Sequence, residues 1–305
     1  MGRLASFPLK DIGKIVVFLL VSALLGALIA PELYWACRWL TDHGLLAFLR
    51  NVEFRRVYDR AILIAVLSLL WPLIRWLNLT RVRELGLERD RRGWKHLFLG
   101  LGLALGSMAV LGAFLLAVHR YNPRVAIPLL KLAAVLPTAA TVAVLEEFLF
   151  RGALQGLLER SNPEWRALLF VAALFSLVHF LKPPLEAVAP GNVTWLSGFE
   201  TIPKCFWQFR QPSLVLGGFT TLFIAGLVLG YSRARTRALW MPVGLHAGWV
   251  IGNLGFPLVA MRASRDSSLW FGRDLLTGIG PVCVLLCTGF VVAFLLRLER
   301  MRSHE

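Results

Sequence analysis

Three ionisable residues lie close together in an otherwise apolar stretch of this sequence. Glu146 and Glu147 are adjacent, and Arg151 follows four residues after Glu147. Each such group costs about 2.5 to 3.5 kcal/mol at the centre of a bilayer, so a membrane segment keeps them only where something compensates. Two isolated histidines, His179 and His246, lie in two later apolar stretches. Two acids, a cation and two imidazoles could therefore form an active site at membrane depth.

The spacing of the acids predicts different roles for them. Residues four apart share a face of a helix, so Glu147 and Arg151 can neutralise each other as a buried ion pair. Glu146 is turned about 100° away from Glu147, which leaves it able to act as a general base. A purely structural ion pair, with Glu146 as an acid at a helix end, is the alternative.

His246 lies well inside its apolar stretch, and Gly244 and Gly248 flank it at minus two and plus two. Such small residues permit close helix packing, which we expect to bring His246 toward the acidic pair. A packing role for the glycines alone is the alternative. Asn253 lies two turns beyond His246 on nearly the same face, about 10 Å further along. A water held between Glu146 and a histidine could hydrolyse an amide, while a neighbouring imidazole or amide stabilises the oxyanion.

Two other kinds of site use the same residue types. Two histidines with one or two glutamates also fit a zinc site with an open position, but the HExxH pattern of many zinc proteases is missing. We therefore predict no metal and no other cofactor, with zinc as the alternative. A proton relay through Lys131, Glu146 and Glu147 would suit a transporter, although the sequence shows no inverted repeat.

Composition indicates the elements that must position these residues. Of the 305 residues, 57% are hydrophobic and 17% are charged, which is typical of polytopic membrane proteins. The formal net charge of +15 could suggest nucleic acid. The basic residues cluster between apolar spans, however, so we predict lipid headgroups and not nucleic acid as the counter-charge. We expect a single integral-membrane domain over residues 1–305, with an all-α bundle of about eight transmembrane helices.

Apolar runs near the length of a membrane span place these helices. The predicted spans are 13–33, 59–79, 96–118, 125–150, 166–181, 212–232, 238–261 and 275–296. An even number puts both termini on one side. The segments on that side, such as 233–237 and 297–302, are rich in arginine, which favours cytoplasmic termini in a multi-pass protein of the cell membrane. Cys37 and Cys205 are expected in two loops on the opposite side, where a disulfide could form.

The motifs resemble one known family. The matching strings are Glu146-Glu147-x-x-x-Arg151, then Phe175-x-x-x-His179, then a histidine in a glycine-rich late helix. They are similar to the CPBP family, also called the type II CAAX prenyl protease or Abi family, of intramembrane glutamic endopeptidases. The likeness covers roughly residues 130 to 260, within a predicted catalytic core over 125–260. It implies an eight-helix membrane fold.

The resemblance also implies roles. Glu146 and His179 would activate water, and His246 would contribute to the oxyanion hole. Supporting positions would be Glu147, Arg151, Phe175 and Asn253. One position departs from the family pattern, which usually has Asn four residues after the late histidine, because this chain has Val250 there. Asn253 is the nearest replacement.

The expected partner is a membrane-anchored protein or peptide substrate within the lipid bilayer. The resemblance leaves the substrate class and the oligomeric state open. The alternative to an enzyme is a non-catalytic membrane interaction or bacteriocin-immunity protein that keeps the same fold.

Overall fold

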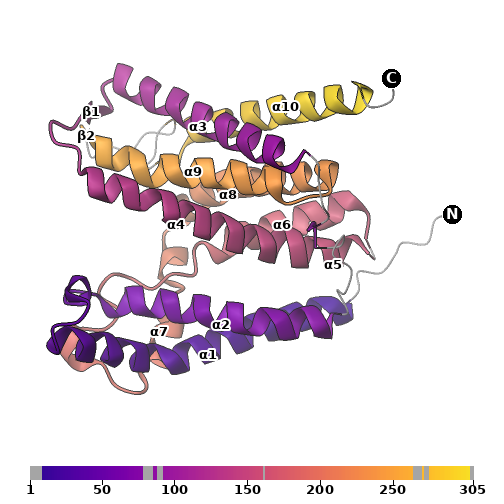
Figure 1. The fold of residues 1–305 in the computed structure, drawn as a ribbon. Coiled ribbons are helices and arrows are strands. Elements are labelled where there is room, and N and C mark those ends of the chain that lie inside the picture. Colours follow the sequence, from indigo (N-terminus) through magenta and orange to yellow (C-terminus); the bar gives the residue numbers. More distant parts are fainter. Residues whose placement is uncertain are drawn as a thin grey trace. The chain divides into compact units, whose positions relative to one another are not determined.

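The computed structural model is an all-α bundle with one short pair of strands, and it describes residues 9–77, 85–87, 92–160, 162–263, 270 and 275–302 (Figure 1). Six helices in this described part are long and apolar enough to cross a membrane: 13–42, 54–76, 93–117, 129–159, 215–236 and 279–302. These confirm the predicted membrane-helix fold and make the chain a multi-pass membrane protein. The last two residues of the predicted span 59–79 lie outside the described residues.

The two remaining predicted spans are helical but are not among the six. The first, α6 (Glu164–Val178), has 15 residues, so its rise is about 22 Å against a hydrocarbon core of about 30 Å. The second, α9 (Trp240–Val259), has 20 residues, but four of them are glycines and two more are His246 and Asn253. Helices with this composition need protein neighbours on most sides.

The helices divide between two compact units, each built from two stretches of the chain. The first unit comprises residues 1–80 and 177–215. Its helices α1 (Leu9–Asp42) and α2 (Phe54–Trp76) form a hairpin through the 3-10 turn η1 (Ala47–Leu49). The short helix α7 (Ser197–Lys204) packs on α1, flanked by the 3-10 turns η3 (Pro190–Asn192) and η4 (Trp207–Arg210).

The approach of α7 to α1 is very close. A Cβ built on Gly198 would lie 1.8 Å from the carbonyl oxygen of Ala27, so only glycine fits there. Cys37, which we expected in a loop, lies inside α1 because that helix continues to Asp42. All four cysteines are free thiols, Cys37 and Cys205 included. Burial raises the pKa of the Cys205 thiol above its usual range, which keeps it protonated and unreactive.

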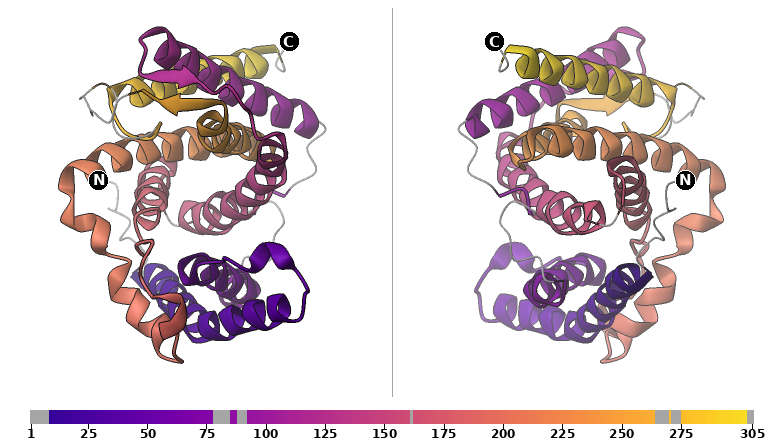
Figure 2. Two further views of the ribbon diagram at one scale, coloured as in Figure 1. Left: turned by 90° about the vertical axis from the view of Figure 1, so that its left-hand side faces the viewer. Right: turned by 90° about the vertical axis from the view of Figure 1, so that its right-hand side faces the viewer.

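The second unit comprises residues 81–176 and 216–305 and is organised around α9. This helix packs against α3 (Gly93–Ala117) and α4 (Leu129–Glu147), and α10 (Ile279–Arg302) packs on α3. Apolar side chains from α3, α9, α10 and α8 (Pro212–Thr236) form its core, including Ala104, Leu229, Leu245 and Val292. Figure 2 shows α9 surrounded by the other helices of this unit.

One small sheet closes an end of this unit. Strand β1 (Tyr121–Pro123) follows α3, and strand β2 (Ala260–Arg262) follows α9. They pair antiparallel, with Tyr121 opposite Arg262 and Pro123 opposite Ala260. The pairing ties the end of α9 to the connection between α3 and α4.

Glycines set the distance between α9 and α3. A Cβ on Gly244 would lie 2.1 Å from the carbonyl oxygen of Leu97, and one on Gly248 would lie 2.9 Å from that of Leu101. Close packing is therefore confirmed, but it is directed at α3 and not at the acidic pair. The reason is geometric, since residues two apart on a helix lie about 200° apart around its axis. The glycines and His246 thus occupy opposite sides of α9.

Replacing Gly244 by alanine is expected to destabilise the protein by about 1 to 3 kcal/mol, because α3 must move away from α9. Gly102→Ala is the matched control, since no atom lies within 4 Å of its added Cβ. That control should be neutral or stabilising, because alanine favours the helix. Thermal unfolding in detergent, followed by tryptophan fluorescence, measures both variants. Equal midpoints for the two would contradict the packing argument.

Candidate active site

The helix that carries the acidic motif changes its geometry at the motif. The α-helix α4 ends at Glu147, and the chain continues as a π-helix, η2 (Phe148–Leu154), into the short helix α5 (Gln155–Glu159). Glu147 and Arg151 are both 0% exposed, and an Nη1 hydrogen of Arg151 is donated to Oε1 of Glu147 at 3.1 Å. The predicted buried ion pair is present. Single π-turns within longer helices occur frequently at functional sites.

Arg151 is fixed from two further directions. Its Nη2 donates to the backbone carbonyl of Gly226 on α8 at 3.3 Å. Its guanidinium lies 4.3 Å from the ring centroid of Phe175, a favourable cation–π contact with α6. The cation therefore links α6 and α8 to the helix of the acidic motif.

His246 reaches the same pair from α9. Its Nδ1 lies 2.7 Å from Oε1 of Glu147, and its ring meets that of Phe175 edge to face at a centroid distance of 5.9 Å. The Glu147 carboxylate pairs with the Arg151 guanidinium as a hydrogen-bond acceptor, so we assign the Nδ1–H of His246 as the donor to it. The orientation of the imidazole is thereby set, and Nε2 becomes the atom available for chemistry.

Glu146 faces that available nitrogen. Its Oε2 lies 3.8 Å from Nε2 of His246, longer than a hydrogen bond, and 30% of its side-chain surface is exposed. The buried carboxylate of Glu147 thus orients the imidazole, while the half-buried carboxylate of Glu146 lies across from it. We call these five residues the acid–imidazole cluster: Glu146, Glu147, Arg151, Phe175 and His246.

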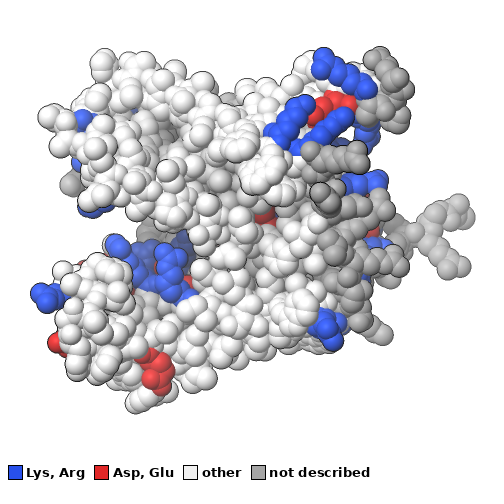
Figure 3. All heavy atoms as spheres, viewed as in Figure 1, with Lys and Arg blue, Asp and Glu red and all other residues white. Residues whose placement is uncertain are grey.

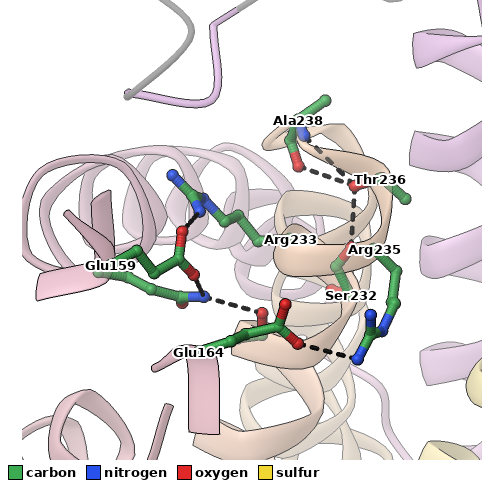
Figure 4. Close-up of polar contacts among 9 residues, drawn as sticks. Glu159, Glu164, Ser232, Arg233, Arg235, Thr236 and Ala238 are labelled. Carbon is green, nitrogen blue, oxygen red and sulfur yellow. Dashed lines mark hydrogen bonds and ion pairs between the residues drawn. The ribbon is translucent and has the colours of Figure 1, made fainter. Parts of the chain in front are cut away.

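A row of polar residues continues from this cluster along the same helix. Gln155 and Glu159 follow Arg151 at successive intervals of four, and Gln155 is 0% exposed. Nε2 of Gln155 donates to Oε1 of Glu159 at 2.8 Å and to the carbonyl of Gly230 at 3.1 Å. Figure 4 shows Arg233 of α8 pointing at Glu159, with which it forms an ion pair.

A second ion pair reinforces this connection. Nη2 of Arg235 donates to Oε1 of Glu164 at 2.9 Å and so joins α8 to the start of α6 (Figure 4). Glycines let α8 approach α6, because a Cβ on Gly226 would lie 3.0 Å from Cα of Ala172. The end of the motif helix, from Arg151 to Glu159, is therefore held to α8 by hydrogen bonds and an ion pair.

Replacing Gln155 by leucine is expected to cost about 1 to 3 kcal/mol, because a buried carbonyl and Glu159 each lose a donor. Thr138→Ala is the comparison within the same span. The Thr138 hydroxyl donates to its own helix, at the carbonyl of Ala134, from an exposed position, so its loss should change stability by at most about 0.5 kcal/mol. Unfolding midpoints of both variants decide the matter. A Gln155→Leu protein as stable as Thr138→Ala would show that the hydrogen bonds of Gln155 do not stabilise the packing of the motif helix on α8.

Two further residues were predicted for the site. His179 is half-buried in the turn that follows α6, in the stretch 177–215 that belongs to the first unit. Asn253 lies seven residues after His246 on α9, which runs through Gly252 as an uninterrupted α-helix. Its separation from His246 along the axis is therefore about 10 Å, as predicted, and it takes no part in the hydrogen bonds of the cluster.

The structure also bears on the two alternative sites, a proton relay through Lys131 and a zinc site. Lys131 is exposed in the first turn of α4, about 24 Å along the helix from Glu147, so it does not extend the acidic pair into a relay. Within the described residues, no group of three or more His, Cys, Asp and Glu side chains is arranged to hold a metal ion.

The residues that hold the motif helix to α8 were not predicted from the sequence. The signal was present, since the spacing of Glu147 and Arg151 continues to Gln155 and Glu159. Their partners are not readable in that way, because two of them are backbone carbonyls of Gly226 and Gly230.

Comparison with known proteins bears on the part of the chain that contains this cluster. A family model described as type II CAAX prenyl endopeptidase Rce1-like matches residues 127–252. No curated protein sequence matched the chain. The matched range runs from just before α4 to within α9, so it includes every residue of the acid–imidazole cluster as well as His179 and Val250. The resemblance predicted from the motifs is thus confirmed, and over residues 127–252 this membrane protein is similar to the CAAX-type endopeptidases of the Rce1-like family.

Proposed function

We propose that this protein is an intramembrane glutamic endopeptidase that hydrolyses a peptide bond in a membrane-anchored protein or peptide. The observation that carries the proposal is the opposition of Glu146 to Nε2 of His246 at 3.8 Å, with the buried Glu147–Arg151 pair behind them. A structural ion pair alone would not require a second acid facing the imidazole. The family similarity supports the same class of reaction.

In the proposed reaction, Glu146 takes a proton from water and the hydroxide oxygen attacks the carbonyl carbon of the scissile bond. The carbonyl oxygen becomes an oxyanion, to which a protonated Nε2 of His246 donates a hydrogen bond. When the intermediate collapses, the C–N bond breaks and Glu146 passes its proton to the leaving nitrogen. Glu147 stabilises the imidazolium through Nδ1, and Arg151 holds Glu147 in place as its ion-pair partner. By the family resemblance, His179 also takes part in activating the water.

The proposed reaction uses no metal. A purified protein is expected to keep its activity in a strong chelator, and added zinc should not increase it. Activity that is lost with chelator and restored by zinc would instead support the zinc-protease alternative. The amide of the family pattern is missing at Val250, so His246 is the proposed donor to the oxyanion.

Quantitative proteomics of membranes tests the function. Cells with the native chain are compared with cells that carry the Glu146→Gln variant at the same level in the membrane. We expect at least one membrane protein to occur in a shortened form only with the native chain. Identical proteomes, together with an identical cellular phenotype, would favour the non-catalytic interaction or immunity protein, for which Val250 is the specific observation.

We further propose that both termini lie on the cytoplasmic side. The support is the arginine-rich end of α8 and of α10, at Arg233, Arg235, Arg300 and Arg302. A reporter fused after Glu305 that is active only in the cytoplasm should be active, and its inactivity would reverse the orientation.

A further inference from the structure

A cavity of about 470 Å³ opens in the second unit where three helix ends meet. These are the start of α3 and the ends of α8 and α10. Its polar wall contains four arginines, one histidine and one glutamate: Arg92, Arg235, Arg297, Arg300, His96 and Glu299. Figure 3 shows Lys and Arg side chains gathered around a carboxylate at the upper right, over the ends of α3 and α10. The volume is that of a site for a small ligand.

Among the residues that the structure describes, the cations around this cavity outnumber the acids. The Glu299 carboxylate is shared between Nζ of Lys95 at 3.1 Å and Nε2 of His96 at 3.0 Å, and Arg92 lies 4.0 Å from it. Glu164 already pairs with Arg235. Arg297 is exposed and has no carboxylate partner among the described residues. Within the part of the chain that the structure describes, positive charge is therefore in excess at the cavity, and a bound anion would relieve the repulsion between the guanidinium groups.

The position and the remaining wall indicate the kind of anion. The cavity lies at the ends of helices long enough to cross a membrane, where lipid headgroups are found. Leu296 and the ring of Tyr231 form apolar parts of the wall, and the Arg235 guanidinium lies 5.0 Å from that ring. Phe294 on α10 and Phe98 on α3 are exposed nearby, at 60% and 61%, as expected of lipid-facing side chains. Guanidinium groups bind phosphate in bidentate fashion, and basic pockets between membrane helices recognise anionic headgroups.

We propose that this cavity binds the phosphate of an anionic lipid headgroup, with Arg297 and Arg300 as principal ligands. Arg235 connects the site to the helix of the acidic motif, because the same turn of α8 carries Arg233, the partner of Glu159. Occupation of the cavity should therefore stabilise the whole second unit. The inference is independent of the proposed hydrolysis.

Thermal unfolding of the full chain in detergent tests this site. Dioleoyl phosphatidylglycerol is expected to raise the unfolding midpoint by several degrees, while dioleoyl phosphatidylcholine, which has no net charge, should not. Glycerol 3-phosphate at millimolar concentration distinguishes the source of the phosphate. If it produces the same shift as the lipid, the site recognises a free phosphate ester, and if it produces none, the site recognises the lipid.

Two pairs of variants assign the effect to the cavity. Arg297→Gln with Arg300→Gln should abolish the shift caused by phosphatidylglycerol. Arg166→Gln with Arg302→Gln removes the same charge from positions outside the cavity wall and should keep it. Because Arg297 is exposed, the single Arg297→Gln variant will fold, and it should lose part of the shift. A full shift in both Arg297 variants, or equal shifts with the two lipids, would overturn the proposal.

Discussion

Glu146→Gln is expected to lower the rate of hydrolysis by about 10²- to 10⁴-fold, the range that a positioned general base contributes. The amide cannot accept a proton from water, although it occupies nearly the same volume. Stability should change by no more than about 0.5 kcal/mol, because Glu146 is partly exposed and stands outside the buried ion pair. The measurement is cleavage of an identified substrate in vesicles, alongside the unfolding midpoint.

Glu32→Gln provides the matched control for this result. Glu32 is an exposed acid within the membrane helix α1, and its replacement makes the same chemical change away from the cluster. It should leave cleavage unchanged. Native-like cleavage by a folded Glu146→Gln protein would remove Glu146 from the reaction, whatever the family similarity suggests.

Arg151→Leu is expected to have the largest effect on stability, about 3 to 5 kcal/mol. The substitution leaves Glu147 buried without its guanidinium, and an uncompensated buried charge is costly. It also removes the cation–π contact with Phe175 and the bond to the carbonyl of Gly226. The folded fraction in membranes and the unfolding midpoint in detergent measure the loss.

The double variant Glu147→Leu with Arg151→Leu separates stability from function. Replacing a buried ion pair by apolar residues is often neutral, so much of the lost stability should return. Activity should not return, because Nδ1 of His246 no longer has a carboxylate to orient it. Recovery of cleavage in the double variant would contradict the role of Glu147. A stable Arg151→Leu single variant would contradict the energetic argument itself.

Features whose geometry is set within a single helix could be predicted from the sequence. The pairing of Glu147 with Arg151 follows from a spacing of four, and the membrane helices follow from uninterrupted apolar runs. Even the distance from His246 to Asn253 is a property of one unbroken helix. Such features depend on neighbours in the chain.

Features that depend on neighbours in space were not predictable in the same way. The glycines at 244 and 248 predicted close helix packing, but their spacing did not predict that α3 would be the partner helix. No residue type predicts the π-helix at 148–154, because that geometry depends on how the motif helix packs. The partners of Arg151 and Gln155 on α8 are carbonyl groups, which every residue possesses.

The composition of α9 has a consequence for how the protein is made. With four glycines, His246 and Asn253, this segment would partition poorly into lipid from a translocon by itself. Its neighbours α3 and α4 precede it in the chain, so both have left the ribosome before α9 is synthesised. The surface of α3 on which α9 packs and the Glu147 carboxylate are therefore both present when α9 is inserted. The hydrogen bond between His246 and Glu147 can thus also help to retain α9 among the other helices during membrane insertion.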